Sequence, residues 1–153
     1  MPTNWEAALR EAGLRVTRPR LAVLDALEAE PHAEADDIVR RVEAALGQTS
    51  PQTVYGVLAA LEASDLVRRI DLPGNAWRYE TRVADNHHHL VCRSCGRVED
   101  VDCVVGAAPC LTPGDTHGFT VEAADVVFSG LCPDCSPLPS DPHDQPTRKD
   151  TDD

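Results

Sequence analysis

Four of the six cysteines in this 153-residue sequence form two Cys-x-x-Cys pairs, Cys92 with Cys95 and Cys132 with Cys135. Two such turns facing each other supply the four thiolates that tetrahedral zinc binds at about 2.3 Å. A pair of redox-active dithiols is the alternative, but neither pair opens a helix after a strand, as thioredoxin-like motifs do. The pattern therefore predicts a structural zinc site that ties distant segments of one small domain together.

Three consecutive histidines, His87 to His89, precede the first cysteine pair. In a strand, alternate side chains share a face, so His87 and His89 would point together and His88 away. Imidazole with carboxylate suits Fe2+, Mn2+ or Zn2+, whereas a solvated polar run is the simpler interpretation. Further donors stand elsewhere in the sequence: Glu80, Asp100 and the more distant His32, for which helix capping is the alternative role.

Neither group includes Cys103, Cys110 or His117. We expect the two cysteines to be buried and inert, with spare metal ligands or redox-active thiols as alternatives. For His117 we expect an ordinary loop position.

The net charge of −12 argues at first against nucleic-acid binding. Residues 1–80 hold nine basic and thirteen acidic side chains, net −4, whereas residues 81–153 hold five and thirteen, net −8. Binding to DNA needs a local basic face and not a basic protein. The basic residues of the first half form two clusters in the sequence: Arg15, Arg18 and Arg20, and Arg68, Arg69 and Arg78.

The rest of the composition indicates a cytosolic protein of one medium or two small domains. Hydrophobic residues make up 42% and aromatic residues 4%, so each core must be aliphatic. No apolar run approaches the roughly 18 residues of a membrane span, and the first residues lack the pattern of a signal peptide. A reducing cytosol disfavours disulfides, which favours metal binding by the cysteine pairs.

The first half predicts four helices, each with a local start or stop signal. The first covers about 5–12 and ends at Gly13, and the second starts after Thr17. The third covers about 33–46. The fourth starts sharply at Ser50, an N-cap residue followed by Pro51 at the first helical position. Its buried face would hold Val54, Leu58 and Leu61, leaving Gln52, Thr53, Tyr55 and Gly56 on another face.

Two short strands follow, at about 66–70 and 77–79, with a turn signal at 72–75 between them. Helices followed by a hairpin outline a winged helix-turn-helix, in which the recognition helix enters the major groove and the wing lies near phosphates. Gln52, Thr53 and Tyr55 would then reach bases or phosphates, and Arg68 and Arg69 would neutralise phosphates. A small helical scaffold without a DNA-binding role is the alternative.

Taken together, residues 5–136 resemble the ferric uptake regulator family, and most closely an actinobacterial branch associated with catalase-peroxidase control. The resemblance rests on the order and spacing of several segments: residues 14–20, 32–37, 50–61, 78–80 and 87–96. It implies an α+β fold and a homodimer. Each subunit would have a winged-helix DNA-binding domain at 1–80 and a small α/β dimerisation and metal-binding domain at 81–136. The Pro- and charge-rich residues 137–153 are predicted to be a disordered tail.

The resemblance also assigns roles to residues. It implies a structural Zn2+ ion held by Cys92, Cys95, Cys132 and Cys135. It implies a regulatory Fe2+ or Mn2+ ion held by five residues: His32, Glu80, His87, His89 and Asp100. We expect contacts with a palindromic DNA operator from Arg15, Arg18, Gln52, Thr53, Tyr55, Arg68 and Arg69.

The implied function is a metal-dependent repressor of iron or oxidative-stress genes, and not an enzyme. Asp100 resembles the peroxide-sensing branch, whereas Glu80 resembles the iron-sensing branch, so both signals stay open. A zinc- or nickel-sensing member of the family is one alternative. A thiol redox protein that uses Cys103 and Cys110, or a metalloenzyme, is the alternative from another class.

Overall fold

The computed structural model of the chain describes residues 3–72, 76–83, 87–102, 114–120 and 126–136. The chain divides into two compact units, Met1–Asn86 (unit 1) and His87–Asp153 (unit 2). The predicted tail at 137–153, Cys103 and Cys110 lie outside the described residues. Among the residues described, no helix is both long and apolar enough to cross a membrane.

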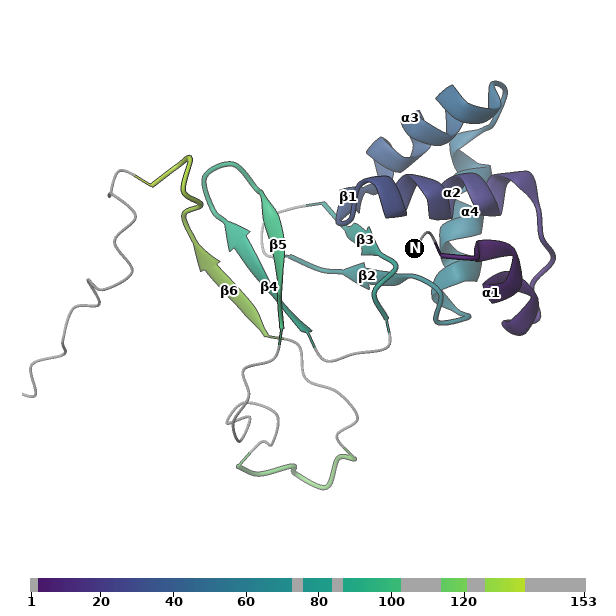
Figure 1. Cartoon of the computed structure of the whole chain (residues 1–153). Coiled ribbons are helices and arrows are strands. Elements are labelled where there is room, and N and C mark those ends of the chain that lie inside the picture. Colours follow the sequence, from purple (N-terminus) through teal and green to yellow (C-terminus); the bar gives the residue numbers. More distant parts are fainter. Residues whose placement is uncertain (1–2, 73–75, 84–86, 103–113, 121–125, 137–153) are drawn as a thin grey trace, which may run out of the picture. The chain divides into compact units, whose positions relative to one another are not determined.

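Unit 1 contains four helices (Figure 1): α1 Trp5–Glu11, α2 Arg18–Ala29, α3 Ala35–Leu46 and α4 Pro51–Glu62. Side-chain caps explain where two of them begin. The Thr17 hydroxyl accepts a hydrogen bond from the amide of Arg20, and the Ser50 hydroxyl accepts one from the amide of Thr53. Each cap satisfies an amide that has no partner within its helix, and a proline in the first turn needs none. The predicted starts at Thr17 and Ser50 are therefore confirmed.

One aliphatic core joins these helices, as the low aromatic content predicts. Leucine, isoleucine and valine side chains from all four helices are at most 1% exposed: Leu9, Val23, Leu24, Leu27, Ile38, Val42, Val54, Leu58 and Leu61. At roughly 1.5–3 kcal/mol for each fully buried aliphatic side chain, this burial supplies the main driving force for folding of unit 1.

A small antiparallel sheet completes unit 1, with strand order β1-β3-β2. Its strands are β1 Ala33–Glu34, β2 Arg68–Ile70 and β3 Arg78–Glu80. The hairpin of β2 and β3 confirms the predicted wing, in the register Arg69 opposite Tyr79. The prediction that the third helix starts at Ala33 is wrong, because Ala33 and Glu34 pair with Tyr79 and Arg78 before α3 begins.

The described residues of unit 2 form a three-stranded sheet with the order β5-β4-β6 (Figure 1). The central strand β4, His87–Cys92, pairs antiparallel with β5, Val98–Asp102, and parallel with β6, Val127–Gly130. Parallel neighbours end at the same edge of a sheet. Because Cys92 at the end of β4 lies opposite Gly130 at the end of β6, the turns after both strands start side by side.

Candidate metal centres and nucleic-acid interface

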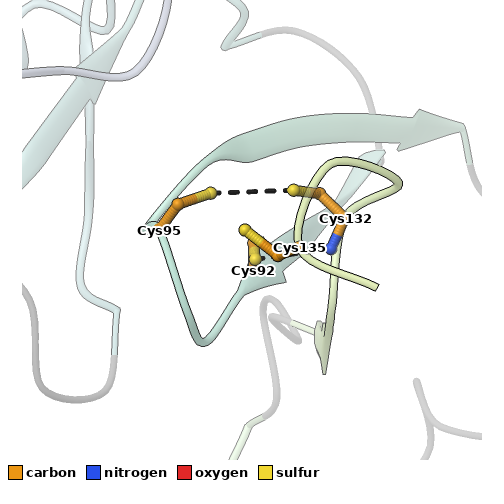
Figure 2. Close-up of side chains that lie close together, drawn as sticks. All are labelled: Cys92, Cys95, Cys132 and Cys135. Carbon is orange, nitrogen blue, oxygen red and sulfur yellow. Dashed lines mark hydrogen bonds between the residues drawn. The ribbon is translucent and has the colours of Figure 1, made fainter. Parts of the chain in front are cut away.

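The four cysteines of unit 2 meet in one cluster, as their spacing predicts. Figure 2 shows their sulfur atoms turned towards one another, and all four sulfurs lie within 4.8 Å of each other. The Sγ atoms of Cys95 and Cys132 are 3.7 Å apart. Four sulfurs at about 2.3 Å from a central zinc ion would be about 3.8 Å from each other. The cluster therefore fits a tetrahedral Zn2+ ion.

Backbone hydrogen bonds shape the two turns that present these sulfurs. The amide of Gly96 donates to the carbonyl of Cys92 over 2.8 Å, and the amide of Cys135 donates to that of Cys132 over 3.0 Å. Gly96 has a φ of +75°, a conformation that a side chain would disfavour. Since β4 and β6 are parallel and adjacent, the sheet itself brings together two turns that are far apart in sequence.

The thiols of the cluster differ in how easily they ionise. The amide of Cys132 donates to the sulfur of Cys92 over 3.3 Å, and this bond, with one from the amide of Cys95, lowers the pKa of Cys92 to about 6. The Ser94 hydroxyl lowers the pKa of Cys135, but contacts with the sulfurs of Cys132 and Cys95 outweigh it and raise that pKa to about 12. Neighbouring sulfurs thus oppose full ionisation, and a divalent cation is what four thiolates at this separation need.

A second donor group lies elsewhere in unit 2, where β4 faces β5. The Nε2 atoms of His87 and His89 lie 3.7 and 3.5 Å from the same carboxylate oxygen of Asp100. Both imidazoles are buried, at 4% and 3% exposure. Two imidazoles with one carboxylate are a donor set typical of Fe2+ sites. The prediction that His87 and His89 share a face is confirmed.

His88 points away from that group, also as the strand periodicity predicts. Its ring packs edge-on against Phe128 of β6, with centroids 6.1 Å apart. His117 is exposed and lies 3.4 Å from the carboxylate of Asp115, in agreement with the ordinary loop position expected for it.

Unit 1 carries a third donor group, made of His32 and Glu80. The His32 Nε2 atom lies 3.4 Å from a carboxylate oxygen of Glu80, and both residues are buried, Glu80 at 1% exposure. Burying a carboxylate is costly without a cationic partner, and the Arg68 guanidinium is 3.9 Å from its other oxygen. The pair therefore places an imidazole nitrogen and a carboxylate oxygen side by side in the interior of unit 1.

The backbone at His32 adopts a φ of +64°, which is strained for a residue with a side chain. Two hydrogen bonds, one made by the His32 amide and one by the His32 carbonyl, hold the backbone in this conformation. Its amide donates to the carbonyl of Tyr79 over 3.0 Å, and its carbonyl accepts from Arg78 Nη1 over 2.9 Å. His32 is thus no helix cap. Its conformation is imposed by β3, the strand that also carries Glu80.

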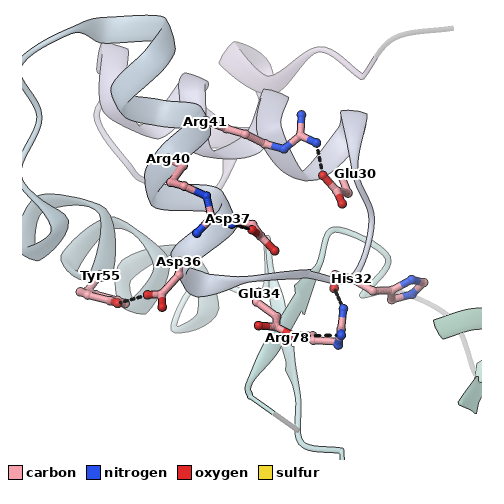
Figure 3. Close-up of polar contacts among 9 residues, drawn as sticks. All are labelled: Glu30, His32, Glu34, Asp36, Asp37, Arg40, Arg41, Tyr55 and Arg78. Atoms are coloured by element: carbon pink, nitrogen blue, oxygen red, sulfur yellow. Dashed lines mark hydrogen bonds and ion pairs between the residues drawn. The ribbon is translucent and has the colours of Figure 1, made fainter. Parts of the chain in front are cut away.

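Arg78 belongs to the basic cluster formed with Arg68 and Arg69 in the sequence, and it also contacts the backbone of His32. Besides the His32 carbonyl, its guanidinium donates to Glu34 over 2.9 Å (Figure 3). Its side chain is only 18% exposed. Arg78 therefore faces the protein, and no pattern in the sequence distinguishes it from its exposed neighbours.

The predicted recognition helix α4 presents the expected two faces. Val54, Leu58 and Leu61 are buried, while the side chains on its other face are exposed: Gln52, Thr53 and Tyr55. A Cβ atom added at Gly56 would meet nothing within 4 Å, so packing within unit 1 does not require glycine there. Within the described part of unit 1, this outer face of α4 is exposed.

The arginines expected to contact DNA have different surroundings. Arg18 is exposed in the first turn of α2, and Arg15 is exposed in the segment before it, where its carbonyl accepts a hydrogen bond from Arg20. Arg69 stacks on the exposed ring of Trp77, with its guanidinium carbon 4.2 Å from the ring centroid. Arg68 is half-buried beside Glu80. The structure therefore leaves Arg15, Arg18 and Arg69 more accessible than Arg68.

Comparison with known proteins agrees with this architecture. Residues 11–109 match the model of the ferric uptake regulator family. The chain is 59% identical over 133 residues to the transcriptional regulator FurA of Mycobacterium tuberculosis, an alignment that covers 87% of this chain and 90% of the relative.

Solved structures show the same fold. The ferric uptake regulator of Vibrio cholerae superposes with a TM-score of 0.64 and 27% identity, over 84% of this chain and all of the other. That of Pseudomonas aeruginosa, solved with manganese, gives 0.62 and 26%, over 86% and 99%. With a family match across most of the sequence, a close relative and two shared folds, this chain belongs to the ferric uptake regulator family.

Proposed function

We propose that this protein is a metal-dependent transcriptional repressor that binds double-stranded DNA as a homodimer in the cytosol. The observation that carries the proposal is found within unit 1. The winged helix offers an exposed helix face, and its strand β3 carries the buried metal donor Glu80 beside His32. A surface for DNA and a buried pair of metal donors built on one small unit are what a metal-responsive regulator needs.

Two metal ions with separate tasks follow from the donor chemistry. Cys92, Cys95, Cys132 and Cys135 would hold a structural Zn2+ ion, since sulfur donors at tetrahedral separations suit zinc. Nitrogen and oxygen donors would hold the regulatory ion, Fe2+ or Mn2+. They are His32 and Glu80 in unit 1, and His87, His89 and Asp100 in unit 2.

Neither of these two donor groups forms a full coordination shell by itself, because Fe2+ and Mn2+ favour about six ligands. We propose that one ion takes ligands from both units, which the family resemblance implies. The bound ion supplies positive charge to carboxylates of both units. Its binding then selects the arrangement of the units that fits two DNA half-sites.

The dimer is supported by an apolar face on the sheet of unit 2. Leu90 and Phe128 lie opposite each other in register and are 46% and 44% exposed, next to the ring of His88. We propose that a second copy of the chain covers this pair of large apolar side chains. We assign DNA binding to residues 1–80, and dimerisation and metal binding to residues 81–136.

Two signals, iron and peroxide, fit the donor residues proposed for the regulatory site. Asp100 favours peroxide and Glu80 favours iron, so we retain both, with control of iron or catalase-peroxidase genes as the outcome. A zinc- or nickel-sensing role would use the same ligands.

The direct test is DNA binding by the full-length, zinc-loaded protein. We expect Mn2+ or Fe2+ to allow selection of a palindromic duplex from a random pool, and a chelator that spares the zinc to abolish it. The Tyr55→Ala variant should bind the selected duplex at least about tenfold more weakly, because an exposed side chain of α4 is lost, and should keep its zinc. Fluorescence anisotropy and metal analysis measure both.

The same assay separates the alternatives. Hydrogen peroxide should release DNA from the Fe2+ form and not from the Mn2+ form if the signal is peroxide. Tight, selective activation by Zn2+ or Ni2+ would identify another sensor of the family. Release that depends on Cys103 and Cys110 and not on His87 would indicate a thiol redox protein. Equal affinity for the duplex with and without the regulatory ion would refute the proposal.

A second prediction concerns Arg78, whose bond to the His32 carbonyl holds that histidine in its strained conformation. We expect Arg78→Met to weaken Mn2+ binding by about 10- to 100-fold, the usual effect of losing a group that orients a metal ligand. Arg40→Met is the matched control, because Arg40 pairs with Asp37 on the exposed side of α3. Calorimetric titration with Mn2+ measures the effect, and an unchanged affinity would show that β3 alone positions His32.

A further inference from the structure

Tyr55 on the outer face of α4 is tied to the neighbouring helix. Its hydroxyl donates a hydrogen bond of 2.9 Å to a carboxylate oxygen of Asp36, in the first turn of α3 (Figure 3). The Tyr55 side chain is nevertheless 44% exposed. The hydroxyl end of the ring is thus held by Asp36, while almost half of the residue's surface stays exposed.

The negative charge of Asp36 is unfavourable on a surface that binds DNA, because the DNA phosphates repel it. Asp36 lies in the first turn of α3, where its negative charge favours the helix dipole. Asp37 follows in the same turn, also favours the helix dipole, and forms an ion pair with Arg40. The contact that distinguishes Asp36 from Asp37 is the bond to Tyr55.

The bond to Asp36 limits rotation of the Tyr55 side chain, and a limited rotation lowers the entropy cost of contacting a base. An exposed tyrosine rotates among rotamers, and a contact with a base edge requires it to give up that freedom. The bond to Asp36 removes part of the freedom before DNA arrives. The raised pKa of Tyr55, caused first by this hydrogen bond and then by the negative charge of Asp36, agrees with an engaged hydroxyl.

We propose that Asp36 is a specificity-determining residue that acts through Tyr55, holding the ring in the orientation that contacts a base edge of the operator. The proposal rests on the proposed DNA-binding function. A preoriented ring favours the one sequence that matches its position, whereas binding to other DNA depends on phosphate contacts that Asp36 does not provide. Asp36 should therefore raise the ratio of specific to non-specific affinity.

The test uses the full-length protein loaded with zinc and Mn2+, and two duplexes. One is the duplex that the wild-type protein selects from a random pool, and the other has the same composition in scrambled order. We expect Asp36→Ala and Tyr55→Phe each to lose about fivefold in affinity for the selected duplex, the effect of one net hydrogen bond, and nothing for the scrambled one. Asp36→Asn, which keeps an acceptor oxygen, should retain most of the affinity.

Two controls show whether Asp36 acts through the hydroxyl. Asp37→Ala should match the wild-type protein on both duplexes, because Asp37 does not contact Tyr55. In the double variant, Asp36→Ala should add nothing to Tyr55→Phe, since the bond is already lost. Near-ultraviolet titration, read against Tyr55→Phe, should show that Asp36→Ala lowers the pKa of the Tyr55 phenol.

Several results would overturn the proposal. They are unchanged affinity of Asp36→Ala, tighter binding of that variant to both duplexes, equal loss on both, or additive losses in the double variant. An unchanged phenol titration in Asp36→Ala would overturn it without reference to DNA. A wild-type protein that selects no duplex would instead refute the proposed function, and with it the role of Asp36 in specificity.

Discussion

The Cys95→Ser variant is expected to lose its zinc ion and the folded sheet of unit 2, while unit 1 stays folded. A hydroxyl is a poor zinc ligand, and three thiolates do not close the tetrahedron. The loss of stability should be on the order of several kcal/mol, a large part of what a structural zinc ion contributes to a small domain.

The difference between the two units follows from what each one buries. Unit 1 has an aliphatic core drawn from four helices. In the part of unit 2 that the structure describes, Val91 and Cys92 are the buried hydrophobic residues, and Leu90 and Phe128 face outward. A sheet with so little buried apolar surface depends on a crosslink, which the zinc site between the ends of β4 and β6 would provide.

Zinc content by atomic absorption, size by light scattering and amide hydrogen exchange measure these effects. We expect exchange to become fast in β4–β6 and to stay slow in α2–α4. Arg93→Ala is the matched control, since Arg93 lies in the same turn and its side chain is exposed. A zinc-free Cys95→Ser protein that keeps slow exchange in β4 would show that the metal is dispensable for the fold.

The elements that sequence analysis predicted correctly are those whose signals are local. Ser50 and Pro51 define the start of α4 because a cap and a first-turn proline act within four residues. The alternation of His87, His88 and His89 follows from the period of a strand. The two Cys-x-x-Cys turns carry their own ligand geometry, so the zinc site was predictable even though its halves are far apart.

What the sequence could not predict depends on partners distant in the chain. The two residues of β1 have no strand pattern of their own and pair only because Tyr79 and Arg78 lie opposite them. The inward direction of Arg78 depends on the His32 carbonyl, 46 residues earlier. The bond between Tyr55 and Asp36 depends on how α3 packs against α4. Each of these features depends on tertiary contacts, which the spacing of residue types along the sequence does not reveal.

The His89→Ala variant is expected to lose metal-dependent DNA binding while it keeps its zinc ion and its dimer. His89 is buried in β4, and its imidazole lies 3.5 Å from Asp100, so its removal leaves His87 and Asp100 as the donors of that group in unit 2. The cysteine cluster starts at Cys92, at the other end of this strand, and does not involve the His89 side chain.

The expected loss of DNA binding follows from the free energy by which the regulatory ion must prefer the DNA-binding arrangement. Shifting a dimer from about 1% to about 99% in the DNA-binding arrangement requires the ion to prefer that arrangement by about 5.5 kcal/mol, or 10⁴-fold. If one missing ligand removes about 100-fold of this preference, saturating Mn2+ brings only about half of the molecules into that arrangement. The Mn2+ concentration for half-maximal DNA binding should also rise by about 100-fold, and the plateau should fall.

Matched variants decide whether that loss comes from the metal site. Asp100→Asn should behave like His89→Ala, because both donors belong to one group. Glu99→Gln should behave like the wild-type protein, since Glu99 precedes Asp100 on β5 but bonds to Arg97. His117→Ala, which removes an exposed imidazole, should also have no effect. If His89→Ala and Asp100→Asn respond to Mn2+ as the wild-type protein does, these residues do not bind the ion that controls DNA binding, and the regulatory site lies elsewhere.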